Sequence, residues 1–359
     1  MRAVWTLAVA ALAAAVALAP IPSAWIDRWF WAGIYPPVQR TVTRVTNLVP
    51  LALFDLLLAC TALVVLVSIV RLVRAAARHK PAAVLVAAGH VVLCGSFLYL
   101  WFAGLWGLNY RKSPVEAVLA LRPGPADAHA VAALGERAVE QANGLHTAAH
   151  APGAEPAEWR NVKLRGAFDA TVARLGRRSP IEPGRLKHSV IGPYFRWTGV
   201  DGMISPFTLE VLGNPDLLPF ERPFVAAHEW SHLAGYADEA EASFVGWLAC
   251  VRADRPSQYS AWLYLLWQIR GEVAPADRAA LDTALAKGPR ADLVAIAERL
   301  RRGAAPTLRR ASWAAYDSYL KANRVEEGVR SYSRVLELLT KAQFDHDWRP
   351  RLREAKTGS

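Results

Sequence analysis

The chain has 359 residues, enough for one large domain or two of ordinary size, and it carries a formal net charge of +11. The basic residues form no single stripe and accompany no nucleic-acid recognition motif, so we expect no nucleic-acid partner. The three cysteines, two of them inside apolar stretches, exclude a disulfide framework and a cysteine-rich metal site.

Three apolar stretches fill the first third of the chain, at residues 3–19, 51–72 and 82–108. A helix needs about 20 mostly apolar residues to cross a bilayer, so each stretch is predicted to be a transmembrane helix. The first also matches a signal peptide, because Ala17-Leu18-Ala19 has the small-x-small pattern of a cleavage site. Pro20 directly after that site disfavours cleavage, so we predict a retained anchor and a lipid bilayer as partner.

The connection between the second and third stretches is short and basic, with Arg71, Arg74, Arg78 and Lys80. Such connections stay on the cytoplasmic side, so the third stretch is predicted to run outward and the rest of the chain to lie outside the cytoplasm. Tryptophans near the outer ends of the stretches are typical of anchors at the membrane interface. They are Trp25, Trp29, Trp31, Trp101 and Trp106.

Residues 113–359 have the mixed composition of a soluble domain, so we divide the chain into a membrane domain, 1–112, and an extracytoplasmic domain, 113–359. The pattern predicts an amphipathic helix from Ala126 to about Gln141, a linker from Ala148 to Pro156, and a short β-hairpin or edge strand within 186–212. From Pro223 onward helical periodicity dominates, so the predicted fold is mainly α. Three basic residues are expected on solvated faces or in contact with anionic lipid: Arg299, Arg301 and Arg302.

The run from Pro223 to Gly235 is predicted to form one helix, because proline is common in the first turn and glycine after the last. His228 and His232 are four residues apart and therefore project from one face, where two imidazole nitrogens can bind one Zn²⁺. Glu229 lies one position round the helix and can reach a metal-bound water. This H-E-x-x-H arrangement is that of zinc peptidases, and it predicts a zinc cofactor.

A catalytic zinc takes a third protein ligand, and three acids follow the helix: Asp238, Glu239 and Glu241. Ligation by Asp238 would mimic the metzincin spacing, with Asp in place of the last His. Asp238 is also a good N-cap for a helix that starts at Glu239, and Glu241 would complete a capping box. That assignment leaves Glu239 as the predicted third ligand, with Glu241 and then Asp238 as alternatives.

The predicted activity is hydrolysis of peptide bonds in a peptide or protein substrate. Zinc lowers the pKa of its bound water, and Glu229 is the predicted general base that passes the proton to the leaving amine. An oxyanion donor is expected among Tyr236, Tyr316, Tyr332 or an arginine. Residues 190–212 form a candidate edge strand for an extended substrate.

Six short stretches of sequence, spread over most of the chain, carry a family resemblance: 33–36, 106–111, 205–210, 228–244, 316–321 and 328–332. Together they resemble domain-of-unknown-function family 3810, bacterial multi-pass membrane proteins regarded as zinc metallopeptidases. Residues 239–244 match the family's Glu-x-Glu-Ala-Asn-Phe pattern and are similar to the gluzincin Glu-x-x-Ala-Asp stretch, whose first Glu binds zinc. The resemblance therefore implies Glu239 as ligand. At position 243 the family usually has Asn, whereas this chain has Ser. Gluzincins have an Asp at this position, and it steadies a His that binds the metal. A serine would fill that role only weakly.

The rival hypothesis is a non-catalytic membrane protein in which a structural metal or a His pair joins two helices. Glu229 argues against it, because a structural site needs no carboxylate beside the metal. An intramembrane protease is disfavoured, because the motif helix has too few consecutive apolar residues to span. We therefore predict a multi-pass protein of the bacterial cytoplasmic (inner) membrane with an extracytoplasmic, zincin-like, mostly helical domain. The sequence predicts neither the oligomeric state nor the substrate.

Overall fold

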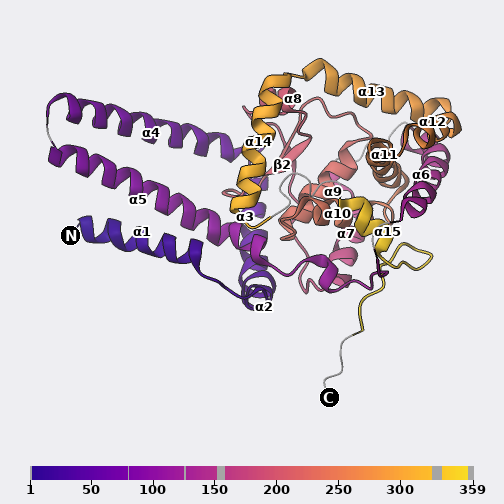
Figure 1. The fold of residues 1–359 in the computed structure, drawn as a ribbon, viewed down its shortest axis with the longest axis horizontal. Coiled ribbons are helices and arrows are strands. Elements are labelled where there is room, and N and C mark those ends of the chain that lie inside the picture. Colours follow the sequence, from indigo (N-terminus) through magenta and orange to yellow (C-terminus); the bar gives the residue numbers. More distant parts are fainter. Residues whose placement is uncertain (1, 80, 125–126, 152–157, 326–333, 355–359) are drawn as a thin grey trace.

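The computed structural model describes residues 2–79, 81–124, 127–151, 158–325 and 334–354 (Figure 1). Helices make up 71% of the described residues and strands 4%, which confirms a mainly α fold with a small sheet. The helices are α1 (Arg2–Leu18), α2 (Ser23–Trp25), the π-helix η1 (Ile26–Ile34), α3 (Tyr35–Asn47), α4 (Leu53–Ala77), α5 (Pro81–Leu105), the 3₁₀ turns η2 (Gly107–Arg111), η3 (Val115–Ala117) and η4 (Glu158–Arg160), α6 (Ala128–Ala149), α7 (Val162–Arg174), α8 (Gly192–Thr198), α9 (Arg222–Leu233), α10 (Glu239–Cys250), α11 (Arg255–Glu272), α12 (Pro275–Ala284), α13 (Lys287–Gly303), α14 (Pro306–Ala322) and α15 (Arg334–Lys341).

The chain is a membrane protein with two helices, α4 and α5, that are long and apolar enough to cross a bilayer. The predicted first stretch is a helix with nearly the predicted ends, α1, but its 17 residues are too few to count as a span alone. It qualifies only together with the segment Ser23–Asn47, from which it is bent by 110°. Pro20 and Pro22 lie at the bend, where the missing N–H groups and the fixed φ of proline stop a helix. The other two spans are found within a few residues of their predicted ends.

The three apolar helices lie side by side and protrude from a helical body (Figure 1). The connection between α4 and α5, which carries the basic residues, is at the far end of these helices from the body. A bilayer around the helices would therefore separate the basic connection from the body.

A buried carboxylate joins the start of α4 to the body. Glu210 accepts hydrogen bonds from the first amides of α4, Leu53 N at 3.0 Å and Phe54 N at 2.8 Å, and pairs with the buried Lys187 Nζ at 2.6 Å. The first amides of a helix have no partner within the helix and carry a partial positive charge, so a carboxylate there is favourable. The span and the body are thus held together by one ionic network.

Glu210→Ala is expected to lower stability by about 3–5 kcal/mol, because it leaves the ammonium of Lys187 buried without its carboxylate. The comparison is Glu182→Ala, which removes the exposed Arg44–Glu182 pair at 3.3 Å and should cost less than about 1 kcal/mol. Thermal unfolding in one detergent, followed by tryptophan fluorescence, measures both. Equal Tm values for the two variants would contradict this role of Glu210.

The small sheet contains β1 (Leu186–Lys187), β2 (Gly202–Ile204) and β3 (Val211–Gly213) in the order β1-β3-β2. β1 is parallel to β3 and β2 antiparallel to it, so β2 is an edge strand. The prediction of extended structure for Tyr194–Trp197 was wrong, because these residues are in α8. Pro193 is in the first turn of that short helix, and Gly199 follows its end with φ of 73°. These helix start and stop residues outweigh the β-forming side chains between them.

Three further expectations change. α6 continues to Ala149 instead of ending near Gln141, and most of the predicted linker after it lies outside the described residues. Arg299 is buried and pairs with Glu221 at 2.6 Å, so it does not lie on a solvated face. Of the predicted tryptophan anchors, Trp31 and Trp106 are buried in the main core, whereas Trp25, Trp29 and Trp101 are exposed.

Candidate metal centre

The motif helix α9 has the predicted boundaries. Pro223 is in its first turn, and Gly235 follows its end with φ of 93°. The imidazoles of His228 and His232 lie on one face, with ring centroids 4.8 Å apart. Only glycine fits at 235, because other residues rarely adopt this φ and a Cβ there would lie 2.6 Å from the Trp31 ring.

Residues next to the spans hold the end of this helix. Trp31 Nε1 donates to Ala234 O at 2.8 Å, and Tyr35 Oη donates to Leu233 O at 3.1 Å. Arg177 Nη1 also donates to Ala234 O, at 2.7 Å. Since the last carbonyls of a helix lack partners within it, these donors fix the position of α9 relative to the membrane helices.

The next helix, α10, returns a carboxylate to the two imidazoles. Asp238 caps its N-terminus by accepting from Ala240 N at 2.9 Å and Glu241 N at 3.1 Å, so Glu239 is its first residue. Glu239 Oε2 lies 3.2 Å from His228 Nε2 and 3.4 Å from His232 Nε2. One possible ligand atom from each of these residues lies within 4.8 Å of the others. One ion can contact all three.

The other nitrogen of each imidazole has a protein partner. His232 Nδ1 donates to Tyr236 O at 2.7 Å, which directs Nε2 of the same ring at Glu239. Ser243 Oγ lies 3.2 Å from His228 Nδ1, so serine does reach the position where a carboxylate or amide was expected to steady a ligand. Such outer partners orient metal-binding imidazoles.

The two oxygens of Glu239 have different surroundings. Oε1 accepts a hydrogen bond from Tyr316 Oη on α14. Oε2 is buried and has no hydrogen-bond partner among the described residues. The carboxylate is thus held by one oxygen while the other faces the imidazoles, as a single-oxygen metal ligand would be.

The site is electrostatically suited to a cation. Burial raises the pKa of Glu239, but His232 and His228 lower it more, and the pKa lies well below its ordinary value. Burial lowers the pKa of His232, while Glu239 and Glu229 raise it, to about 9 in balance. The carboxylates therefore favour positive charge at His232, whether from a proton or a metal. Two imidazole nitrogens and an ionised carboxylate with one unpartnered buried oxygen fit a metal ion that takes nitrogen and oxygen ligands.

Glu229 lies beside this group. It is buried, and its Oε2 has no hydrogen-bond partner among the described residues. Burial raises its pKa, an effect that the charges of His228 and His232 partly offset. The edge strand lies directly against it, since a Cβ on Gly202 would be 2.8 Å from Glu229 Oε1. A buried carboxylate with a raised pKa is suited to accept a proton.

Close packing of α9 on α10 depends on Gly246. A Cβ at this position would lie 2.9 Å from His228 N and 3.1 Å from Ala227 C, both backbone atoms that cannot turn away. A glycine here therefore lets the two helices approach closely enough for Glu239 and Ser243 to reach His228.

Gly246→Ala is expected to destabilise the protein by about 1–3 kcal/mol and to weaken metal binding, because the two helices must separate. Gly166→Ala in α7 is the matched control, since nothing lies within 4 Å of its Cβ. There alanine should be neutral or stabilising by up to about 1 kcal/mol. Thermal unfolding and zinc titration of both variants measure the effects, and a Gly246→Ala protein that binds zinc like the wild type would refute this role.

The other two acids of the cluster lie elsewhere. Asp238 is the N-cap and also lies 3.5 Å from Arg334 Nη1. Glu241 accepts from Val115 N at 2.7 Å and pairs with the buried Lys112 Nζ at 3.4 Å. The predicted capping box is therefore absent, because the Glu241 side chain turns to the segment that follows the spans instead of returning to the N-cap. Its contacts join α10 to that segment.

A family model described as "Protein of unknown function (DUF3810)" matches residues 30–340. The chain belongs to this family. The match includes α9, α10 and α14, and thus every residue of the candidate centre. No curated protein and no solved structure matches the chain, so its function has to be argued from the site.

The predicted oxyanion donors of this DUF3810 protein differ in position. Tyr236 is in the core, where its hydroxyl is buried and its ring lies against Trp31 and Lys112. Tyr316 lines the cavity next to the candidate centre, and Tyr332 lies outside the described residues. Sequence reasoning missed Trp106, whose ring lies 6.1 Å from that of His232; it appeared only as an interfacial tryptophan.

A second group has metal-ligand spacing: His146 of α6 and His150 directly after it, with Asp292 of α13. Asp292 Oδ2 lies 2.8 Å from His150 Nε2 and 3.6 Å from His146 Nε2. The same oxygen accepts a hydrogen bond from Tyr259 Oη. Because a phenol already holds the oxygen that faces the imidazoles, we assign this group to a hydrogen-bonded network between helices and no metal to it.

Proposed function

We propose that this protein is a membrane-anchored, zinc-dependent peptidase with a zincin-like site. His228, His232 and Glu239 would hold the ion, which leaves a fourth position for water, as catalytic zinc requires. The observation that carries the proposal is the unpartnered, buried carboxylate oxygen of Glu229 beside these three ligands. A site that only joined helices would have no use for it.

The roles of the chain's own residues follow from their positions. Zinc, when bound, would lower the pKa of a water molecule and polarise a carbonyl. Glu229 accepts the proton as the water oxygen attacks the substrate carbonyl carbon. It then donates this proton to the departing amide nitrogen, so that the C–N bond breaks to give a carboxylate and an amine. Tyr316 Oη lines the cavity but donates its proton to Glu239 Oε1, so its role is to steady the third ligand.

The edge strand β2 supplies a means of holding an extended peptide. Asn214 N donates to Asp201 O and Ser205 N to Glu210 O, both at 2.8 Å, so positions 201 and 205 face β3. In an antiparallel pair the alternate residues, Gly202 and Ile204, direct their backbone groups to the outer edge. That edge lines the cavity beside Glu229. A substrate pairing there would lie against the general base.

The proposed side of the membrane is extracytoplasmic. The body and the basic α4–α5 connection are at opposite ends of the spans. Since basic connections stay in the cytoplasm, the body would be outside it.

The test is cleavage of a fluorogenic peptide mixture by the full chain in lipid nanodiscs. We expect cleavage that is lost after treatment with a zinc chelator and regained when zinc is added back. Cleavage that survives complete metal removal, or none with zinc bound across a broad mixture, would count against a zinc peptidase.

A further inference from the structure

A cavity of about 800 Å³ adjoins the candidate centre, and His228, Glu229, His232 and Glu239 form its polar end. This volume falls in the range of about 300–1,000 Å³ typical of ligand sites. The cavity is thus much larger than the space that a water molecule and one scissile peptide bond require. The side chains of its other walls should therefore match the chemistry of the substrate.

One wall belongs to a membrane span. Leu98, Tyr99, Phe102 and Ala103 lie in the last two turns of α5, at the end nearest the body. Leu98 and Tyr99 are half-buried, so their side chains are not sealed inside the protein. The cavity therefore extends from the metal ligands to the part of α5 that lies within the adjoining half of the bilayer.

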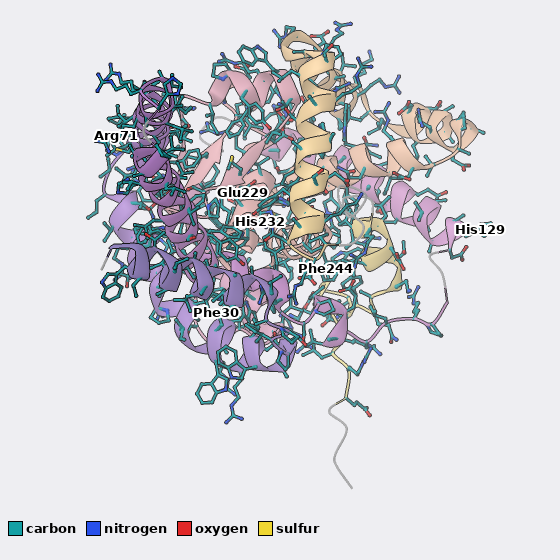
Figure 2. All side chains as sticks on the ribbon, turned by 60° about the vertical axis from the view of Figure 1, so that its left-hand side comes forward. Phe30, Arg71, His129, Glu229, His232 and Phe244 are labelled. Carbon is teal, nitrogen blue, oxygen red and sulfur yellow. The ribbon has the colours of Figure 1, made fainter. Side chains whose placement is uncertain are left out.

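The remaining walls are mostly aromatic and apolar. α14 contributes Trp313, Tyr316 and Tyr319, and β2 contributes Met203 and Ile204. Figure 2 turns the spans toward the viewer and shows Glu229 and His232 between the spans and the upright helix α14. A polar segment entering here would lose hydration without gaining hydrogen bonds, whereas an apolar one would be stabilised by burial.

Two arginines line the cavity, Arg111 and Arg324, and both donate hydrogen bonds to backbone carbonyls around the end of α1. Arg324 Nη2 donates to Ala19 O at 3.3 Å. Arg111 Nη2 donates to Val16 O at 2.8 Å and to Ala17 O at 3.0 Å. These carbonyls end α1, so the guanidinium stabilises a helix terminus. The chemistry of the cavity therefore favours an uncharged, apolar occupant.

We propose that the substrates of this site are membrane-anchored polypeptides, of which an apolar segment enters the cavity along α5 from the adjoining half of the bilayer. The inference rests on the proposed peptidase function and adds the substrate class. The outer edge of β2 would pair with the backbone of the segment, while the aromatic walls receive its side chains.

The experiment measures occupation of the cavity separately from cleavage. It uses the Glu229→Gln protein in nanodiscs with two benzophenone-labelled peptides. One is an apolar segment joined to a leucine-rich anchor of about 20 residues. The other is a serine- and glycine-rich segment without an anchor. We expect the anchored apolar peptide to crosslink to residues of α5 and α14 after illumination.

Leu98→Trp would fill the membrane side of the cavity and should reduce this crosslinking by about fivefold or more. Leu85→Trp, at a position 74% exposed near the other end of α5, is the matched control and should have no effect. Unchanged Tm and zinc content show that both variants fold. Equal labelling by the anchor-free polar peptide, or no labelling of the cavity by the anchored one, would overturn the inference. If either outcome is found while the wild type still cleaves soluble peptides, the proposed substrate class is wrong and the peptidase proposal stands.

Discussion

Glu229→Gln is expected to lower the rate of peptide cleavage by about 10²–10⁴-fold, the usual contribution of a general base. Glutamine has nearly the same shape as glutamate but cannot accept the proton. Because Glu229 is not one of the three residues whose ligand atoms converge, bound zinc should stay at the wild-type amount. Initial rates at saturating peptide, with metal content measured on the same sample, provide the test.

Cleavage rate and zinc content, measured together, distinguish a peptidase from a protein with a structural metal site. A structural metal site would lose nothing measurable on this substitution, since no cleavage would exist to lose. A Glu229→Gln protein that cleaves at the wild-type rate would assign the base elsewhere. A variant that loses zinc as well would make Glu229 a ligand, against its position outside the cluster.

Glu239→Ala is expected to reduce zinc affinity by more than about 100-fold, because loss of an outer hydrogen-bond partner alone costs about 10–100-fold. The substitution removes the only carboxylate of the described residues that contacts both His228 Nε2 and His232 Nε2. Competition with a chromophoric zinc chelator measures the affinity.

The matched control is Glu241→Gln, two residues along the same helix. Its amide oxygen still accepts from Val115 N, so α10 keeps its attachment to the segment after the spans. We expect zinc affinity within about threefold of the wild type, since the side chain faces away from the metal ligands. A large loss for Glu241→Gln with none for Glu239→Ala would reverse the assignment of the third ligand.

Local signals made part of this structure predictable. The ends of α9 follow from Pro223 and Gly235, and the N-terminus of α10 follows from Asp238, because each of these residues acts through its own backbone or its nearest amides. The four-residue spacing of the histidines fixes their common face. The three apolar helices follow from the length of apolar sequence, whereas the bend after the first follows from the two prolines.

Other features depend on partners distant in the sequence. Glu241 fits a capping box by spacing, yet its carboxylate turns to Val115, 126 residues away. Trp31 and Trp106 have the composition of interfacial anchors, but they pack against the motif helix. Tyr316 reaches Glu239 only because α14 packs along the cavity that adjoins the metal ligands. No pattern within a short stretch carries these contacts, since they arise when separate helices pack.

The most direct test of the metal centre is the zinc content of the full chain purified in nanodiscs, measured by elemental analysis. We predict one zinc per chain in the wild type and in His150→Ala, whose histidine belongs to the hydrogen-bonded network, and close to none in His232→Ala. A wild-type protein without a transition metal, or a His232→Ala protein that keeps its zinc while His150→Ala loses it, would contradict the account.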